Sequence, residues 1–121
     1  MPTGPDFISL QVRDLDAAAA FYEERVGLRR APASPPRAVV FATEPIAFAV
    51  RELLPSTDLD AGQPGLGIAV WVKVEAAQAL HDRLAADGAV TIVTAPFDGP
   101  FGRTFALADP DGYVITLHDG A

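Results

Sequence analysis

The chain has 121 residues, half of them hydrophobic, with a formal net charge of −7 and no cysteine. A single domain of this length buries roughly two-thirds of its unfolded surface. The negative charge argues against nucleic acid as a partner and is compatible with a cationic ligand. No apolar run reaches the ~20 residues that span a bilayer, and no leader precedes the first strand pattern. We therefore expect a cytoplasmic protein with no membrane partner and no disulfides.

Three segments of the first half alternate apolar and polar residues, which predicts strands. They are residues 7–13, 37–43 and 46–52. After the first of them, Asp14 is placed to cap a helix that Gly27 ends. The Pro-rich residues 53–66 predict a linker or a mobile loop.

The second half shows the same succession of patterns. Residues 67–74 predict a strand, and residues 75–87 predict a helix that Gly88 ends. The segments that follow are a short strand at 89–93, a Pro/Gly loop at 94–102 and a hairpin at 103–118. The hairpin turns at Asp109-Pro110-Asp111-Gly112, whose residue types suit a type I turn closed by a bulge. Its second arm has one apolar face and one face that includes Thr116 and His118, as expected of a wall between a core and a ligand cleft.

The two halves repeat one another. Ile8, Leu10 and Val12 recur 60 positions later as Ile68, Val70 and Val72. The pattern predicts an α+β fold of two β-α-β-β-β modules in a single domain of residues 1–121. We place module one at about 6–53, the linker at about 54–66 and module two at about 67–119. The second faces of the two modules can close a shared cleft, which is the default ligand site.

Several motifs together resemble the vicinal oxygen chelate superfamily, which includes glyoxalase I, fosfomycin-resistance enzymes, extradiol dioxygenases and bleomycin-resistance proteins. The motifs are Val12-Arg13-Asp14-Leu15-Asp16, Phe21-Tyr22, Gly27-Leu28, Phe101-Gly102-Arg103 and Asp109-Pro110-Asp111-Gly112. The resemblance covers residues 7–118. It implies an incomplete eight-stranded barrel around a cleft, commonly assembled as a homodimer.

Enzymes of that superfamily hold a divalent metal with His, Gln or Glu side chains. The resemblance places Phe7, Gly67 and Thr116 at those positions. A benzene ring and a glycine offer no lone pair, and a lone hydroxyl is a poor ligand for a divalent ion. We therefore expect neither a metal nor another cofactor, and the closest likeness is to the metal-free members that bind antibiotics.

Ten residues are expected to contact a small-molecule ligand. They are Phe7, Ser9, Gln11, Phe41, Phe48, Trp71, Arg103, Phe105, Thr116 and His118. Trp71 either stacks on a flat or cationic ligand beside Phe7, or fills the core or a dimer seam. The phenylalanines of the later strands either join it or lie in the core.

The polar candidates also have alternatives. Ser9 and Gln11 are placed to orient a ligand, whereas Arg103 either meets the ligand or pairs with a carboxylate. His118 is expected to donate or accept hydrogen bonds rather than to act as a base, because no Ser, Cys or Asp partner is evident from spacing. His81 is expected at the solvent edge of the second helix.

These residues favour metal-free binding of a small, partly aromatic or cationic molecule, with antibiotic sequestration of the bleomycin-resistance type as its specific form. One alternative is an enzyme: a lyase or dioxygenase with shifted ligands such as His118 and Glu52, or a metal-free isomerase that uses His118. The other is a dimeric scaffold that binds no ligand.

Overall fold

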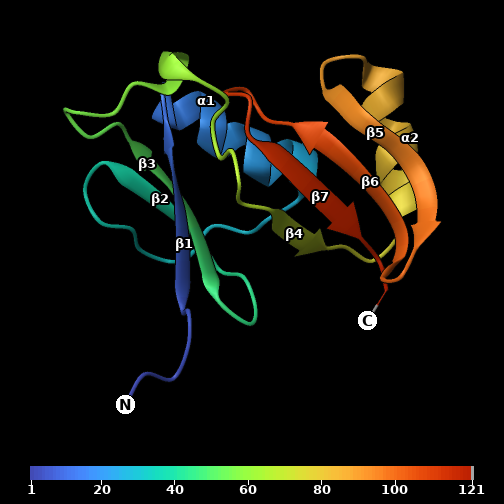
Figure 1. Cartoon of the computed structure of the whole chain (residues 1–121), viewed down its shortest axis with the longest axis horizontal. Coiled ribbons are helices and arrows are strands. Elements are labelled where there is room, and N and C mark those ends of the chain that lie inside the picture. The colour runs from blue at the N-terminus through green and yellow to red at the C-terminus, as the bar shows by residue number, and fades with distance from the viewer. Residues whose placement is uncertain (121) are drawn as a thin grey trace. The chain divides into compact units, whose positions relative to one another are not determined.

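The computed structural model describes residues 1–120, and the chain divides into two compact units, the first Met1–Asp58 and the second beginning at Leu59. The described part has seven strands in two sheets and two α-helices (Figure 1). The α+β class predicted from the sequence is therefore confirmed. No helix within residues 1–120 is both long enough and apolar enough to cross a bilayer.

The first unit packs one helical segment on a three-stranded sheet. Its elements are β1 (Phe7–Val12), α1 (Leu15–Ala20), the π-helical turn η1 (Phe21–Val26), β2 (Ala38–Phe41) and β3 (Ala47–Glu52). The order is β1-β3-β2, with β1 parallel and β2 antiparallel to β3. Both predicted helix ends are confirmed: the Asp14 carboxylate accepts the Ala17 N–H at 3.0 Å, and Gly27 ends the helix with φ 93°.

Three buried aromatic rings form the core of the first unit. The Tyr22 ring centroid lies 5.0 Å from that of Phe48 and 6.3 Å from that of Phe41. Tyr22 belongs to η1 and the phenylalanines to β3 and β2, so these rings fasten the helix to the sheet. Ile8 pairs with Phe48 in the β1–β3 register and faces the helix with it. Because side chains alternate along a strand, Phe7 and Ser9 point to the opposite face.

The first unit has one strand fewer than predicted, so the eight-stranded count is wrong. The β-α-β-β-β pattern implies a further strand between the first helix and residues 37–43, for which the sequence pattern defines no range of its own, and there only Arg30 bridges Phe41. The Ala31 N–H donates to the Val40 carbonyl at 2.9 Å, but three prolines follow within five residues, at 32, 35 and 36. Proline has no N–H to donate to a ladder, so the pairing stops there.

The second unit has the full predicted β-α-β-β-β succession. Its elements are the 3-10 turn η2 (Leu59–Ala61), β4 (Val70–Lys73), α2 (Ala77–Asp87), β5 (Thr91–Gly99), β6 (Gly102–Ala108) and β7 (Val114–His118). The order is β4-β7-β6-β5, with β4 parallel to β7 and the other pairs antiparallel. Gly88 ends α2 with φ 72°, as predicted. Both sheets are open among the described residues.

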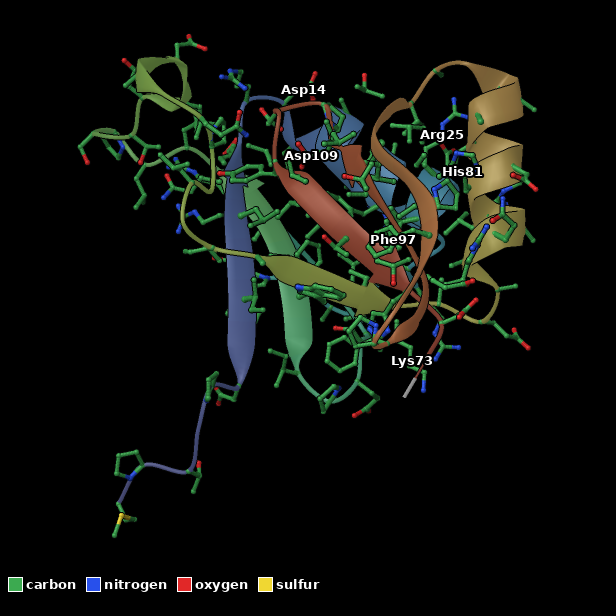
Figure 2. The ribbon with its side chains drawn as sticks, turned by 45° about the vertical axis from the view of Figure 1, so that its right-hand side comes forward. Asp14, Arg25, Lys73, His81, Phe97 and Asp109 are labelled. Atoms are coloured by element: carbon green, nitrogen blue, oxygen red, sulfur yellow. The ribbon has the colours of Figure 1, made fainter. Side chains whose placement is uncertain are left out.

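One face of this sheet is the core of the second unit. Helix α2, which carries His81 (Figure 2), packs against β6 and β5. The His81 ring centroid lies 5.4 Å from that of Phe105, edge to face. Leu107, Ile115 and Leu117 share that face and are at most 1% exposed. His81 is therefore half-buried against the sheet, and its expected place at the solvent edge is wrong.

Two boundaries in the second unit differ from the prediction. Strand β4 begins only at Val70, because Gly65 and Gly67 have positive φ and the Ile68 N–H donates to the Gly65 carbonyl at 3.0 Å, which makes a turn. The predicted loop at 94–102 is mostly strand, since β5 continues to Gly99. Register shifts between Ile92 and Phe97 absorb the proline at 96 at this outer strand, which is where sheets tolerate proline.

The predicted turn of the hairpin is confirmed. The Asp109 carboxylate accepts the N–H groups of Asp111 and Tyr113, each at 2.9 Å, and the Gly112 N–H donates to the Asp109 carbonyl at 3.0 Å. Gly112 has φ 95°, which glycine adopts without strain. The turn fixes the register in which β6 and β7 pair.

Candidate functional site

The candidate site lies on the face of the second sheet that α2 does not cover. In the strand registers, Trp71 of β4 pairs with Thr116 of β7, and Thr116 pairs with Ala106 of β6. Lys73 likewise pairs with His118. These side chains alternate with the core residues of the same strands, so they share the face opposite α2. Trp71, Thr116 and His118, three of the residues expected to contact a ligand, therefore lie on one face of this sheet, and their contact with a ligand stays a prediction.

Three rings form an exposed aromatic cluster there, which we define as Trp71, Phe101 and His118. Their centroids are 5.6 Å apart for Trp71 and Phe101, 5.7 Å for Trp71 and His118, and 6.0 Å for Phe101 and His118. Each pair is edge to face, the arrangement that ring quadrupoles favour. Trp71 and Phe101 are each 47% exposed. The cluster therefore leaves ring surface on which a flat molecule can stack.

His118 is held by the backbone beside the cluster. Its Nδ1 lies 3.2 Å from the Phe101 carbonyl oxygen, which also accepts the Gly120 N–H at 2.7 Å. A carbonyl can only accept, so a hydrogen bond here requires the proton on Nδ1. In the neutral ring Nε2 is then the acceptor. The interaction orients the His118 ring and ties it to the turn that carries Phe101.

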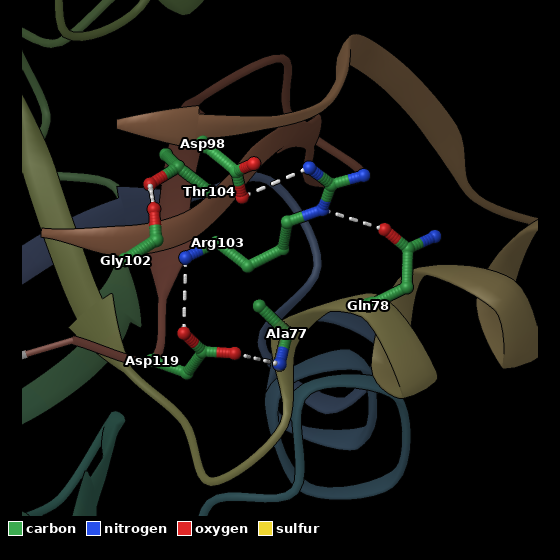
Figure 3. A network of polar contacts seen from close by, with 7 residues as sticks. All are labelled: Ala77, Gln78, Asp98, Gly102, Arg103, Thr104 and Asp119. Atoms are coloured by element: carbon green, nitrogen blue, oxygen red, sulfur yellow. Dashed lines mark hydrogen bonds and ion pairs between the residues drawn. The ribbon is translucent and has the colours of Figure 1, made fainter. Parts of the chain in front are cut away.

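Asp119 connects this turn to the start of α2 (Figure 3). One carboxylate oxygen accepts the Arg103 backbone N–H and the other accepts the Ala77 N–H, each at 3.0 Å. Ala76, at the N-cap position, makes no side-chain cap, so Asp119 satisfies a helix N–H group from a distant part of the chain. The residue next to His118 thus fixes the end of β7, the β5–β6 turn and α2 together.

Arg103 and Phe105 lie on the other face of the sheet. The Arg103 Nε donates to the Gln78 side chain at 2.8 Å and its Nη1 meets the Asp98 carboxylate at 3.0 Å (Figure 3). Arg103 is therefore engaged with a carboxylate, which is one of the two alternatives considered for it. Phe105 is fully buried in the core.

Helix α2 also carries a group of hydrogen-bonded polar side chains, formed by Gln78, His81 and Asp82. The Asp82 carboxylate meets His81 Nδ1 at 3.0 Å and accepts the Gln78 amide at 2.9 Å. The hydrogen bond with His81 and then that from Gln78 lower the pKa of Asp82 from its ordinary value, because both stabilise the charged form. This group lies on the helix side of the sheet and has no part in the aromatic cluster.

The candidates of the first unit fall into two sets. Phe7 is 50% exposed and Ser9 is exposed, on the β1 face away from the helix. Gln11 shares that face, and its side-chain oxygen accepts the Leu54 N–H at 2.9 Å, which ties β1 to the linker. Phe41 and Phe48 are buried in the core. The shared cleft expected from the repeat stays a prediction.

The residues at the metal positions of the resembling enzymes do not fit a divalent cation. Phe7 presents a ring, Thr116 a single hydroxyl, and Gly67 has no side chain and precedes β4 rather than heading it. Among residues 1–120, no three His, Cys, Asp or Glu side chains come close enough to hold an ion.

Two members of the site were missed in the sequence. Phe101 lies in the tight turn between β5 and β6, and only the long-range pairing of β6 with β7 brings it to His118. Lys73 was available from the pattern, since it is two residues from Trp71 in an alternating strand. Its significance depends on the parallel pairing of β4 with β7, which the sequence pattern did not define.

Comparison with protein families gives one match over most of the chain. The model described as Glyoxalase/Bleomycin resistance protein/Dioxygenase superfamily matches residues 4–117. The comparison with curated proteins gives no match.

Solved structures show the same fold. TnmS3, an antibiotic binding protein from Streptomyces sp. CB03234, is 24% identical with a TM-score of 0.76, over 99% of this chain and 98% of that one. The bleomycin-binding protein from Streptomyces verticillus is 19% identical with a TM-score of 0.68, over 100% of both chains. The fosfomycin resistance protein FosX from Listeria monocytogenes is 20% identical with a TM-score of 0.73, over 100% of this chain and 96% of that one.

Proposed function

Because the chain belongs to the Glyoxalase/Bleomycin resistance protein/Dioxygenase superfamily, we propose that it binds a small, partly aromatic molecule without a metal and releases it unchanged. One observation carries the proposal: Trp71 and Phe101, each 47% exposed, stand edge to face on a sheet face that α2 does not cover. Half-exposed rings held by a strand and a tight turn offer stacking area at little entropic cost, since their positions are fixed before the ligand arrives.

Antibiotic sequestration is the specific form of this function that we propose. The names of two similar structures support it, since TnmS3 is described as antibiotic binding and the Streptomyces verticillus protein as bleomycin-binding. Sequestration requires affinity and no reacting group, which accords with a phenylalanine and a glycine at two of the positions where related enzymes hold their metal. A homodimer, expected from the resemblance, is part of the proposal, and sedimentation equilibrium tests it.

The binding test uses the single tryptophan of the chain as its reporter. Titration with planar aromatic antibiotics and bleomycin-like glycopeptides should quench or shift Trp71 emission with a saturable curve. Phe101→Ala should weaken that binding about fivefold, because one edge-to-face neighbour of the stacking surface is lost. Leu66→Ala truncates an 82% exposed side chain outside the cluster and should leave affinity unchanged. If none of these compounds gave a saturable change in Trp71 emission, the proposal would be refuted.

A second candidate, a metal-free isomerase, is favoured by the hydrogen bond between His118 Nδ1 and the Phe101 carbonyl. That bond fixes the tautomer in which Nε2 is a proton acceptor, as a general base requires. Turnover of a thiol–methylglyoxal adduct, abolished by His118→Ala, would establish this alternative. Binding of the adduct without proton exchange from its carbon would exclude it.

A further inference from the structure

Lys73 is the only lysine in the chain, and it lies at the end of β4 (Figure 2). Because side chains alternate along a strand, it shares a face with Trp71. Residues two apart in a strand are about 7 Å from one another, and the parallel register sets Lys73 beside His118. In the strand register, Lys73 is therefore at the edge of the aromatic cluster. A four-carbon stem lets it reach over the neighbouring rings.

No described carboxylate neutralises this charge. Among the described residues, Arg103 pairs with Asp98 and His81 with Asp82, whereas Lys73 forms no ion pair. Asp119 is the carboxylate nearest in sequence to His118, and each of its oxygens accepts a hydrogen bond from a backbone N–H group. An exposed cation thus borders an exposed aromatic surface in a chain whose net charge is −7.

We propose that the ligand of the aromatic cluster is a planar aromatic anion, with its ring against Trp71 and Phe101 and its carboxylate, phenolate or sulfonate at Lys73. This inference rests on the proposed function and specifies its ligand class. It reverses the expectation of a cationic ligand drawn from net charge. Charges farther than a Debye length of about 8 Å are screened at physiological salt, so the group in contact decides the preference.

Thr116 contributes to the same arrangement. It lies between Trp71 and Ala106 in the registers of the sheet, and its hydroxyl is a donor that an anionic oxygen can use. An ammonium-bearing ligand would meet Lys73 as a like charge. The face therefore discriminates by repulsion of cations as well as by attraction of anions.

The test compares three probes with one ring system: 2-naphthoate, 2-naphthamide and 2-naphthylmethylammonium. Isothermal titration at 50 mM salt should give the tightest binding for the carboxylate and the weakest for the ammonium. The carboxylate should exceed the amide about fivefold, the upper range for one exposed charge pair. Raising salt to 500 mM should remove most of this difference.

Lys73→Gln should reduce the ratio of naphthoate to naphthamide affinity to about one. Arg29→Gln removes the same charge from an exposed side chain of the first unit and should preserve the ratio. Equal binding of the three probes, with Phe101→Ala weakening all of them, would overturn the anion preference and leave the proposed function standing. Binding of none of them would overturn both.

Discussion

At the scale of single residues, Asp119 does more than its place after the last strand suggests. Its two oxygens serve the backbone of the β5–β6 turn and the first turn of α2. No local sequence pattern predicts that Asp119 caps α2, because an N-cap residue is expected immediately before its helix, where this chain has Ala76. The Asp14 cap was predictable from sequence because it precedes its own helix, whereas the Asp119 cap depends on a contact across 42 positions.

Asp119→Ala should lower the free energy of unfolding by about 1 to 2 kcal/mol, since α2 loses its cap and two N–H groups lose their acceptor. Urea unfolding followed by circular dichroism measures the change. Asp119→Asn should recover little of it, because its amide nitrogen would face one of the two donors. Asp6→Ala, which removes an exposed carboxylate before β1, is the control and should unfold like the parent. Equal urea midpoints for Asp119→Ala and Asp6→Ala would contradict the stabilising role of Asp119 as a cap of α2.

Asp82 gives a prediction about pH. Its pKa is lowered in the folded chain, so its ionised form contributes stability above the unfolded pKa of 3.8, and this contribution disappears as pH falls through the lower folded value. Asp82→Asn should therefore unfold at lower urea than the parent at pH 6, with a smaller difference at pH 2.5. The group is exposed, so the effect is small. A difference that grows on acidification would contradict the direction of the shift.

At the scale of elements, the end of β7 and the β5–β6 turn approach each other closely enough to require glycine. A Cβ on Gly102 would lie 2.6 Å from the Gly120 nitrogen, and Gly102 also has φ 88°. Gly102→Ala should therefore cost about 1 to 3 kcal/mol in stability and displace Phe101 from Trp71. Gly62→Ala, where an added Cβ meets nothing within 4 Å, should be nearly neutral.

Thermal unfolding and near-ultraviolet circular dichroism of Trp71 measure these two effects of Gly102→Ala. A variant as stable as Gly62→Ala, with an unchanged aromatic spectrum, would show that the turn yields without disturbing the cluster. Gly102 is visible in the sequence, but the reason for it is not, because that reason is the backbone of Gly120, which follows β7.

Most elements were predictable because their signals are local. Alternation gave β1 and β7, and glycines in left-handed conformations ended both helices. The errors arose where pairing overrides composition. Proline suppressed the expected strand after η1, yet at the outer strand β5 register shifts accommodate it. Whether a proline breaks a strand thus depends on which neighbour the strand has, and one sequence does not show this.

At the scale of the whole chain, the repeat predicted the α+β class, and the motifs together with the paired modules indicated the family, which the match over residues 4–117 confirms. The site was predictable only in part. Trp71, Thr116 and His118 were expected because they alternate with core residues. Phe101 reaches them through the turn that Asp119 and Gly102 hold, so it had no local signal. An aromatic residue in a predicted strand gives the same sequence pattern whether its ring is buried or exposed. Only the structure shows that the rings of Phe41, Phe48 and Phe105 are buried, whereas that of Trp71 is exposed.

The solitary lysine also decides how this protein can be handled in the laboratory. Reagents that attach proteins to sensor chips through amines react with the amino terminus and with lysine, which here means Lys73 beside the stacking rings. Protein molecules immobilised through Lys73 would have their aromatic cluster facing the chip matrix. Such a chip would under-report capture relative to free solution, whereas attachment through an introduced tag would not.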